Sequence, residues 1–222
     1  MSEVDDELRR ERLTRFWTRW GLVVGGLIIV LLIAFGGYLY WQHRQHEGAA
    51  TDGEQLQTAY DALGQNDTKT AEAKLKTLAG ADVDAYRALA QFTQADILLQ
   101  KNDLKGAAAR FATVANDASL AQPFRDLALI RQTMAEYDTL KPDAVIARLG
   151  AFAVPGNAWF GSAGEMVAVA YLRMNKRDQA GRLFGQIASD KDVPDTLRQR
   201  AVQMASVLGV DAVGQIEDTK TQ

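Results

Sequence analysis

The sequence predicts an all-α protein, in which a single transmembrane helix precedes a solenoid of about four helical hairpins closed by a last helix. Two patterns predict this fold: an uncharged run from Gly21 to Trp41, and alanine-centred patterns that recur at intervals of 36 or 37 residues. The chain has no cysteine, so packing alone has to hold it together. We expect a charged segment at 1–20, the transmembrane helix at 21–41, the repeat domain at 42–210 and a mobile tail at 211–222.

The uncharged run has the length of a membrane span. At about 1.5 Å per residue, its helix covers a hydrocarbon core of about 30 Å. Aromatic residues, which are favoured at the lipid headgroups, stand at both ends: Trp17 and Trp20, then Tyr38, Tyr40 and Trp41. A buried helix of a globular core is the alternative, and it would need neither the length nor the aromatic ends. We therefore expect lipid to surround residues 21–41.

The flanking arginines predict the orientation of the span. Five precede it and only Arg44 follows it closely; the five are Arg9, Arg10, Arg12, Arg15 and Arg19. Because Lys and Arg are retained inside, residues 1–20 should be cytoplasmic and the rest external. A cleaved signal peptide would have a shorter apolar region with small residues close behind, and here the nearest such cluster begins only at Gly48. The span should therefore be an uncleaved anchor.

Two glycine and aromatic patterns near the span leave alternatives open. Gly21 and Gly25 form a GxxxG spacing that either packs against another helix or is simply tolerated in lipid. Before the span, one helical face either lies at the headgroups or belongs to a solvated lead-in; it carries Leu13, Phe16, Trp17 and Trp20.

Beyond the span, four alanines mark a repeat: Ala71, Ala107, Ala144 and Ala180. Around three of them an Asn-containing polar turn precedes the alanine, and a large apolar residue follows four positions later. Another alanine stands twelve residues earlier in the same three copies: Ala59, Ala95 and Ala168. Small residues on two antiparallel helices let the backbones approach closely, and the large residue then packs on the next hairpin. We expect the alanines at helix crossings and a final helix over Asp192–Leu208 closing the stack.

This pattern resembles the tetratricopeptide repeat, with Asn-Asp in two turns where that repeat has Gly-Asp. The third copy, residues 124–150, is degenerate, with Gln132 at an expected alanine position and Lys141-Pro142 in the turn. Since its period still holds, we interpret it as a diverged repeat.

The whole chain, with its charged start, its span ending in Tyr38-Leu39-Tyr40-Trp41 and its repeat domain, resembles the ancillary SecYEG translocon subunit family of Gram-negative bacteria. The resemblance implies a single-pass inner-membrane protein with a cytoplasmic N-terminus and a periplasmic domain. It also implies translocon proteins and periplasmic chaperones as partners. It carries over no functional residue.

The sequence offers no residue set for catalysis or for a cofactor. His43 and His46 are the only histidines, and without cysteine a metal site there would need ligands from elsewhere. Two carboxylate pairs, Asp82/Asp84 and Asp190/Asp192, fall between predicted helices, where they are solvated turn and cap residues more often than acid–base groups. The net charge of −3 argues against nucleic acid as a partner. We therefore expect no enzyme activity, no metal and no small-molecule substrate.

We expect protein partners in the groove lined by the first helix of each hairpin. The residues predicted to face it are Leu56, Tyr60, Phe92, Asp96 and Leu99. Tyr60, Phe92 and Asp96 attract attention because an aromatic or a carboxylate there is expected to have no core role, whereas Leu56 and Leu99 fit simple packing. The predicted function is a membrane-anchored periplasmic scaffold, accessory to SecYEG, that links secreted proteins to folding factors. The alternative is an anchored scaffold for outer-membrane biogenesis or cytochrome maturation, since one fold serves many partners.

Overall fold

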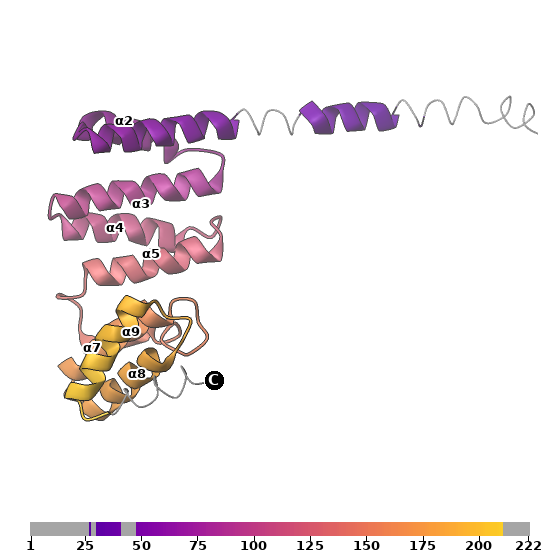
Figure 1. Ribbon diagram of the computed structural model, residues 1–222. Coiled ribbons are helices and arrows are strands. Elements are labelled where there is room, and N and C mark those ends of the chain that lie inside the picture. The colour runs from indigo at the N-terminus through magenta and orange to yellow at the C-terminus, as the bar shows by residue number, and fades with distance from the viewer. Residues whose placement is uncertain (1–26, 28–29, 41–47, 211–222) are drawn as a thin grey trace, which may run out of the picture. The chain divides into compact units, whose positions relative to one another are not determined.

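A computed structural model describes residues 27, 30–40 and 48–210 (Figure 1). The chain divides into two compact units, Met1–Glu54 and Gln55–Gln222. In the smaller unit, residues 30–40 and 48–54 are helical. No helix among the described residues is both long and apolar enough to cross a membrane. The rest of the predicted span and the predicted tail lie outside the described residues, and so do His43 and His46.

The larger unit is helical throughout its described part, with no strand between residues 55 and 210. It starts with helical residues 55–64, which pair with the first numbered helix, α2. The numbered helices are, in chain order, α2 (Thr68–Leu78), α3 (Asp84–Gln100), α4 (Leu104–Asn116), α5 (Gln122–Ala135), α6 (Pro142–Leu149), α7 (Phe160–Arg173), α8 (Arg177–Ser189) and α9 (Asp195–Val207). The helices pair into hairpins: 55–64 with α2, α3 with α4, α5 with α6, and α7 with α8. The last helix, α9, lies where the sequence predicts the closing helix.

The alanines of three repeats sit at the helix crossings, as the sequence predicts. Ala71, Ala107 and Ala180 are completely buried on the second helices of their hairpins. So are their partners on the first helices, Ala59, Ala95 and Ala168. Four positions after each second-helix alanine a large side chain is also buried: Leu75, Phe111 and Phe184. A methyl group at each crossing therefore sets the close backbone approach on which the larger side chains pack.

The third hairpin follows the same rule one residue later, which corrects the predicted register. Ala144 is only half-buried, and the completely buried residue is Val145. Twelve residues before it, the buried position is Thr133 rather than Gln132, and four residues after it Leu149 is buried. Thr133 is tolerated in this core because its hydroxyl donates to the Leu129 carbonyl oxygen at 2.8 Å. The repeat is complete but displaced, and its crossing residues are larger.

An asparagine with a left-handed backbone makes the tight turn in the other three hairpins. Asn66, Asn102 and Asn175 have φ angles of 61°, 59° and 59°. In the second hairpin the Asn102 amide donates to Leu99 and the next amide, of Asp103, donates to Leu98, both at 2.9 Å. These paired bonds satisfy the last carbonyls of the first helix, in the manner of a Schellman motif.

The aspartate after this asparagine starts the second helix in two hairpins. The Asp103 carboxylate accepts from the Gly106 amide at 2.8 Å, and the Asp67 carboxylate accepts from the Thr70 amide at 3.1 Å. Each side chain thereby satisfies one of the unpaired amides at a helix N-terminus. The Asn-Asp pair therefore ends one helix and begins the next within two residues.

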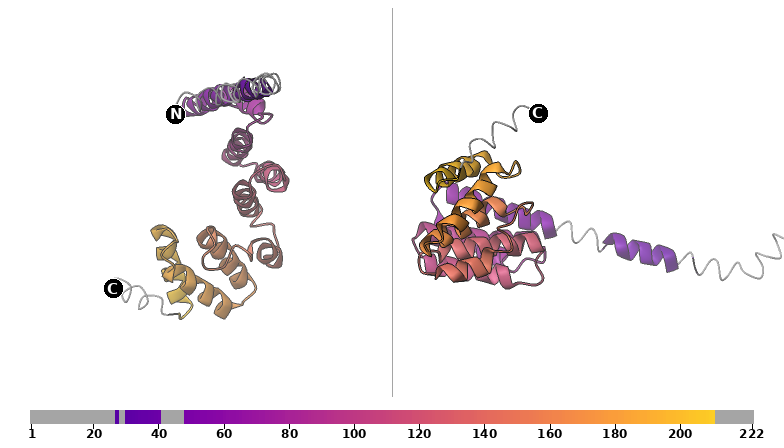
Figure 2. Two further views of the ribbon diagram at one scale, coloured as in Figure 1. Left: turned by 90° about the vertical axis from the view of Figure 1, so that its right-hand side faces the viewer. Right: turned by 90° about the horizontal axis from the view of Figure 1, so that it is seen from below.

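Three apolar clusters form the core of the larger unit. One joins residues 56–97 around Leu75 and Leu78, and a second lies between α3, α4 and α5 around Phe111. The third and largest extends from α5 to α9 around Phe160 and Phe184. The hairpins stack in a curve in which α3 and α5 lie on the inner side and α4 and α6 on the outer side (left view of Figure 2). The first helices of successive hairpins thus share the inner surface.

Candidate functional site

The inner helices present a stripe of partly exposed side chains of mixed character. Tyr60 retains 41% of its surface exposed, and Met134 on α5 retains 57%. Between them in sequence lie the half-buried Asp96 on α3 and Arg131 on α5. We call Tyr60, Asp96, Arg131 and Met134 the inner stripe. Arg131 and Met134 are three residues apart and therefore share one face of α5.

An ion pair joins two helices within the inner stripe. The Arg131 guanidinium donates to the Asp96 carboxylate at 2.5 and 3.3 Å. The same guanidinium carbon lies 4.9 Å from the centre of the Phe111 ring. Arg131 therefore stacks on the buried second cluster while its charge meets a carboxylate, so its position is fixed from two sides.

The structure separates the predicted groove residues into two groups. Tyr60 is exposed and Asp96 is half-buried, so both side chains reach the surface. Phe92 is only 6% exposed and its ring lies 5.9 Å from that of Phe111, so the expectation that it has no core role is wrong. Leu56 is buried in the first cluster and Leu99 packs against the second, which fits their reading as packing residues.

Sequence reasoning missed Arg131 and Met134. Met134 directly follows the buried Thr133, as Tyr60 follows Ala59 and Asp96 follows Ala95. The displaced third repeat hid this equivalence, because the sequence analysis placed the crossing position of that repeat at Gln132 rather than at Thr133. The sequence signal for Arg131 was weaker. Arg131 lies 35 residues after Asp96, close to one repeat length, and carries the opposite charge.

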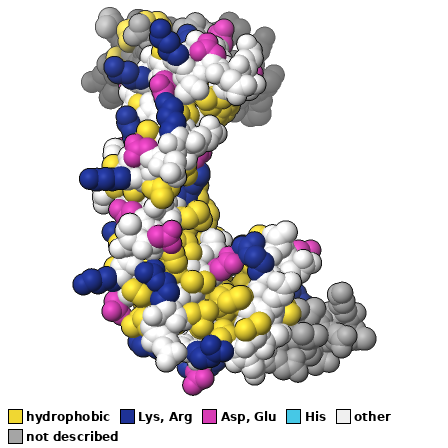
Figure 3. Space-filling model, turned by 90° about the vertical axis from the view of Figure 1, so that its left-hand side faces the viewer, with side chains coloured by type: hydrophobic (Ala, Val, Ile, Leu, Met, Phe, Trp, Pro, Cys, Tyr) yellow, Lys and Arg dark blue, Asp and Glu magenta, His cyan; other side chains and the backbone are white. Residues whose placement is uncertain are grey.

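Apolar side chains gather along a hollow on one face of the larger unit (Figure 3). Charged side chains are more frequent on its margin in the same view. An apolar floor with charges at its edge is the usual composition of a surface that binds a polypeptide. The larger unit thus offers an apolar hollow on one face, and its inner helices α3 and α5 carry a partly exposed ion pair.

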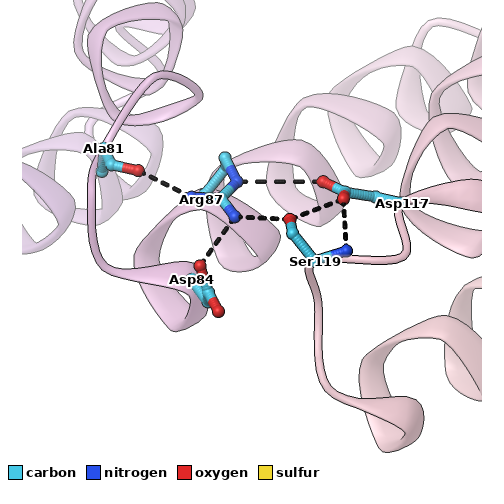
Figure 4. A network of polar contacts seen from close by, with 5 residues as sticks. All are labelled: Ala81, Asp84, Arg87, Asp117 and Ser119. Atoms are coloured by element: carbon cyan, nitrogen blue, oxygen red, sulfur yellow. Dashed lines mark hydrogen bonds and ion pairs between the residues drawn. The ribbon is translucent and has the colours of Figure 1, made fainter.

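A polar network holds the loops on one side of the stack. Arg87 on α3 donates to the Ala81 carbonyl at 2.9 Å, to Asp84 at 2.7 Å and to the Ser119 hydroxyl at 2.9 Å (Figure 4). Ser119 in turn donates to Asp117 from its amide at 2.9 Å and from its hydroxyl at 2.6 Å. The Ser119 hydroxyl holds the pKa of Asp117 below its usual value, because both bonds favour the ionised carboxylate. The network ties the loop before α3 to the loop before α5, and it fixes the spacing of these inner helices.

Arg173 performs a similar role farther along the stack. It donates to the carbonyl oxygens of Tyr137 and Leu140 at 3.0 Å each, and its guanidinium lies over the Tyr137 ring. The Tyr137 hydroxyl donates to the Met166 carbonyl at 2.8 Å. Burial raises the pKa of Tyr137, and the nearby Arg173 opposes that rise only in part. The turn between α5 and α6 is therefore attached to α7.

The described residues show no arrangement that would hold a metal ion. Within 27, 30–40 and 48–210, no group of three His, Cys, Asp or Glu side chains gathers closely enough. Asp82 lies in the loop before α3, as predicted, whereas Asp84 is the first residue of that helix rather than a loop residue. Asp84 pairs with Arg87, so it contributes to the loop network.

A comparison with protein families finds a family that matches most of the chain. The family described as "Tetratricopeptide repeat-like domain" matches residues 14–206. Neither the comparison with curated proteins nor that with solved structures found a match. The match includes every hairpin described above, and the helical hairpins and their small crossing residues are those of such a repeat. The chain therefore belongs to the tetratricopeptide repeat-like domain family.

Proposed function

We propose that this protein is a membrane-anchored scaffold that binds other proteins through the inner stripe. The observation that carries the proposal is the exposure of Met134 one turn after Arg131, whose ion pair with Asp96 joins the inner helices. Tyr60 is also exposed, on the first helix of the stack. Exposed aromatic and methionine side chains next to an arginine are the residue types enriched in protein interfaces. Repeat stacks use their concave surfaces for such contacts.

The inner stripe supports a binding role because its polar members are already positioned. Arg131 is held by Phe111 and Asp96, so little side-chain entropy remains to be lost when a partner arrives. Met134 is flexible and polarisable, and it can adapt to partners of different shape. The combination favours a surface that accepts several related polypeptides.

We further propose that residues 21–41 anchor the chain in a bacterial inner membrane, with the N-terminus cytoplasmic and the repeat domain periplasmic. The uncharged run, its aromatic ends and the five preceding arginines support this location. Anchoring beside a translocon raises the effective concentration of weak partners without any additional contact. In this role the scaffold is an accessory to SecYEG and passes secreted proteins to periplasmic folding factors.

Photo-crosslinking in membranes tests the proposal. A photoreactive amino acid replaces Tyr60 or Met134 in the full chain, and the products are identified by mass spectrometry. The matched control places the same amino acid at Thr113, an exposed position on the outer helix α4. We expect translocon subunits and folding factors to be crosslinked from Tyr60 and Met134 and not from Thr113. Equal products from all three positions would argue against the inner stripe, and products confined to another envelope machinery would favour the alternative scaffold.

Two further variants separate the anchor from the surface. Removal of residues 1–41 should reduce crosslinking because the local concentration is lost. Replacement of both His43 and His46 should leave it unchanged, because they are expected to bind no essential metal. A periplasm-dependent reporter fused after Gln222 should be active, whereas activity of a cytoplasm-dependent reporter there would reverse the proposed orientation.

A further inference from the structure

We propose a second binding site, for the arginine side chain of a partner polypeptide, in a hollow between the α6–α7 loop and the α8–α9 loop. It shares no residue with the inner stripe and does not depend on membrane anchoring. Its residues come from two loops and from the first turns of α7 and α9. The hollow has a volume of about 440 Å³, which is within the usual range for ligand sites.

Two carboxylates and one aromatic residue line this hollow. Asp190 and Asp192 contribute from the α8–α9 loop, and Trp159 contributes from the residue before α7. Val193 and Leu197 supply the apolar part of the lining. A guanidinium can stack on an indole ring while donating two parallel hydrogen bonds to a carboxylate, and its aliphatic stem packs on apolar residues.

The two carboxylates have no cation to neutralise them among the described residues. Lys191 stands between them in sequence but forms no ion pair with either, and it does not line the hollow. The nearest arginine in sequence, Arg198, pairs with Asp195 instead. Two unpaired negative charges beside an apolar surface attract a cation, and they disfavour an acidic or neutral ligand.

The loops that carry these residues are fixed by their own hydrogen bonds. The Asp190 carboxylate accepts from the Asp192 amide at 2.9 Å, and the Asn157 side chain accepts from the Trp159 amide at 2.9 Å. Gly161 lies beneath them, and a β-carbon there would approach Val193 to 2.8 Å. The hollow is therefore preformed, and binding does not require ordering of the loops.

The site suits an organic cation better than a metal ion. One oxygen of Asp190 is already used by the Asp192 amide. Calcium prefers six to eight oxygen ligands, and two carboxylates beside apolar residues supply too few. An arginine of an extended segment, by contrast, can reach the carboxylates while the rest of its chain remains outside.

Fluorine NMR of the full chain in lipid nanodiscs, labelled with 5-fluorotryptophan, tests the assignment. The Trp159 resonance is identified by its loss in Trp159→Phe. The probe is acetyl-Gly-Arg-Gly-amide, and the comparison peptide carries citrulline, which has the same shape without the charge. We expect a saturable shift of the Trp159 resonance with the arginine peptide, and binding at least about tenfold weaker with citrulline, because charge-assisted hydrogen bonds are lost.

The variants place the binding on the two carboxylates. Asp190→Asn with Asp192→Asn should weaken binding at least about tenfold, since both charges are removed. Asp195→Asn is the matched control, because Asp195 is also acidic and close in sequence but does not line the hollow. If the double variant lowers the unfolding midpoint, Asp192→Lys serves instead, because the Asp192 side chain holds no loop hydrogen bond. Equal binding of citrulline, unchanged binding in Asp192→Lys, or the same shift with calcium chloride alone would overturn the proposal.

Discussion

The carboxylate of Asp96 on α3 lies 2.5 Å from the guanidinium of Arg131 on α5, so an ion pair joins the first helices of two successive hairpins. Both side chains are partly exposed, which limits the energy of the pair itself. Arg131 differs from Asp96 because it also covers Phe111. The two partners should therefore contribute unequally to stability.

Arg131→Ala should destabilise the protein by about 1–2 kcal/mol, and Asp96→Ala by less than about 1 kcal/mol. The arginine loses its stacking on Phe111 together with the ion pair, whereas the aspartate loses only the ion pair. Urea unfolding of each variant measures the difference. Equal losses would show that the stacking contributes nothing, and a large loss for Asp96→Ala would mean that the pair is shielded from water.

The helix crossings give a second prediction. Ala107→Leu and Ala180→Leu should each destabilise the fold by about 1–3 kcal/mol, because an enlarged side chain must separate two close backbones. Ala144→Leu is the matched control, since Ala144 is half-buried beside the true crossing residue, and it should cost clearly less. The exposed Ala50 should tolerate the change. A cost at Ala144 equal to that at Ala107 would contradict the displaced register.

The hairpins were predictable because alanine at a crossing leaves a signature of composition and spacing. The third hairpin was predicted as a repeat but in the wrong register. Thr133 and Val145 are not small residues, so only their complete burial in the structure identifies them as the positions equivalent to the crossing alanines. Phe92 was misjudged for a related reason: helices in the middle of a stack are packed on several sides, and one sequence cannot show which face a later hairpin covers.

The asparagine turns give a third prediction. Asn102→Ala should destabilise the protein by about 1 kcal/mol, because alanine is strained in the left-handed conformation at φ 59°. Asn102→Gly should be nearly neutral, since glycine adopts that conformation freely. Thermal unfolding of the two variants makes the comparison. If alanine were tolerated as well as glycine, the strain argument would fail at this turn.

Tyr137 predicts a loss of stability in alkali. Its folded pKa is raised above the usual value of about 10, so the folded state holds its proton more tightly than the unfolded state. This contribution is complete below pH about 10 and is lost as the pH rises through the folded pKa. Unfolding free energies measured between pH 8 and 12 should decline less in Tyr137→Phe than in the parent. A parallel decline in both proteins would assign the alkaline loss to other groups.

The lowered pKa of Asp117 predicts that stability is lost as the pH falls. Its folded pKa lies below the usual value of 3.8, so its contribution is present above that pH and is lost as the pH falls through the folded pKa. Ser119→Ala removes the bond from the hydroxyl, which is the largest cause of the lowered pKa, and leaves the bond from the amide. It should therefore make stability less sensitive to pH in this range. Denaturant titrations between pH 2 and 5 compare the variants, and an unchanged acid limb would remove Asp117 from the explanation.

The binding surfaces were less predictable than the fold. Tyr60 and Asp96 could be placed from repeat geometry, because they follow the crossing alanines directly. Met134 required the corrected register, and Trp159 could not be connected with Asp190 from sequence, since the two lie in different loops. Whether two loops lie close together depends on how the hairpins stack, and this cannot be predicted from the spacing of residues along the chain.

The division of the core into separate clusters affects how the protein unfolds under mechanical force. Ala128 and Ile130, two residues apart on α5, belong to different apolar clusters. One cluster packs toward the beginning of the stack and the other toward its end, so α5 is a boundary between two blocks. A pulling force applied through the chain ends should therefore extend the protein in separate steps, with α5 as the point where the first rupture stops.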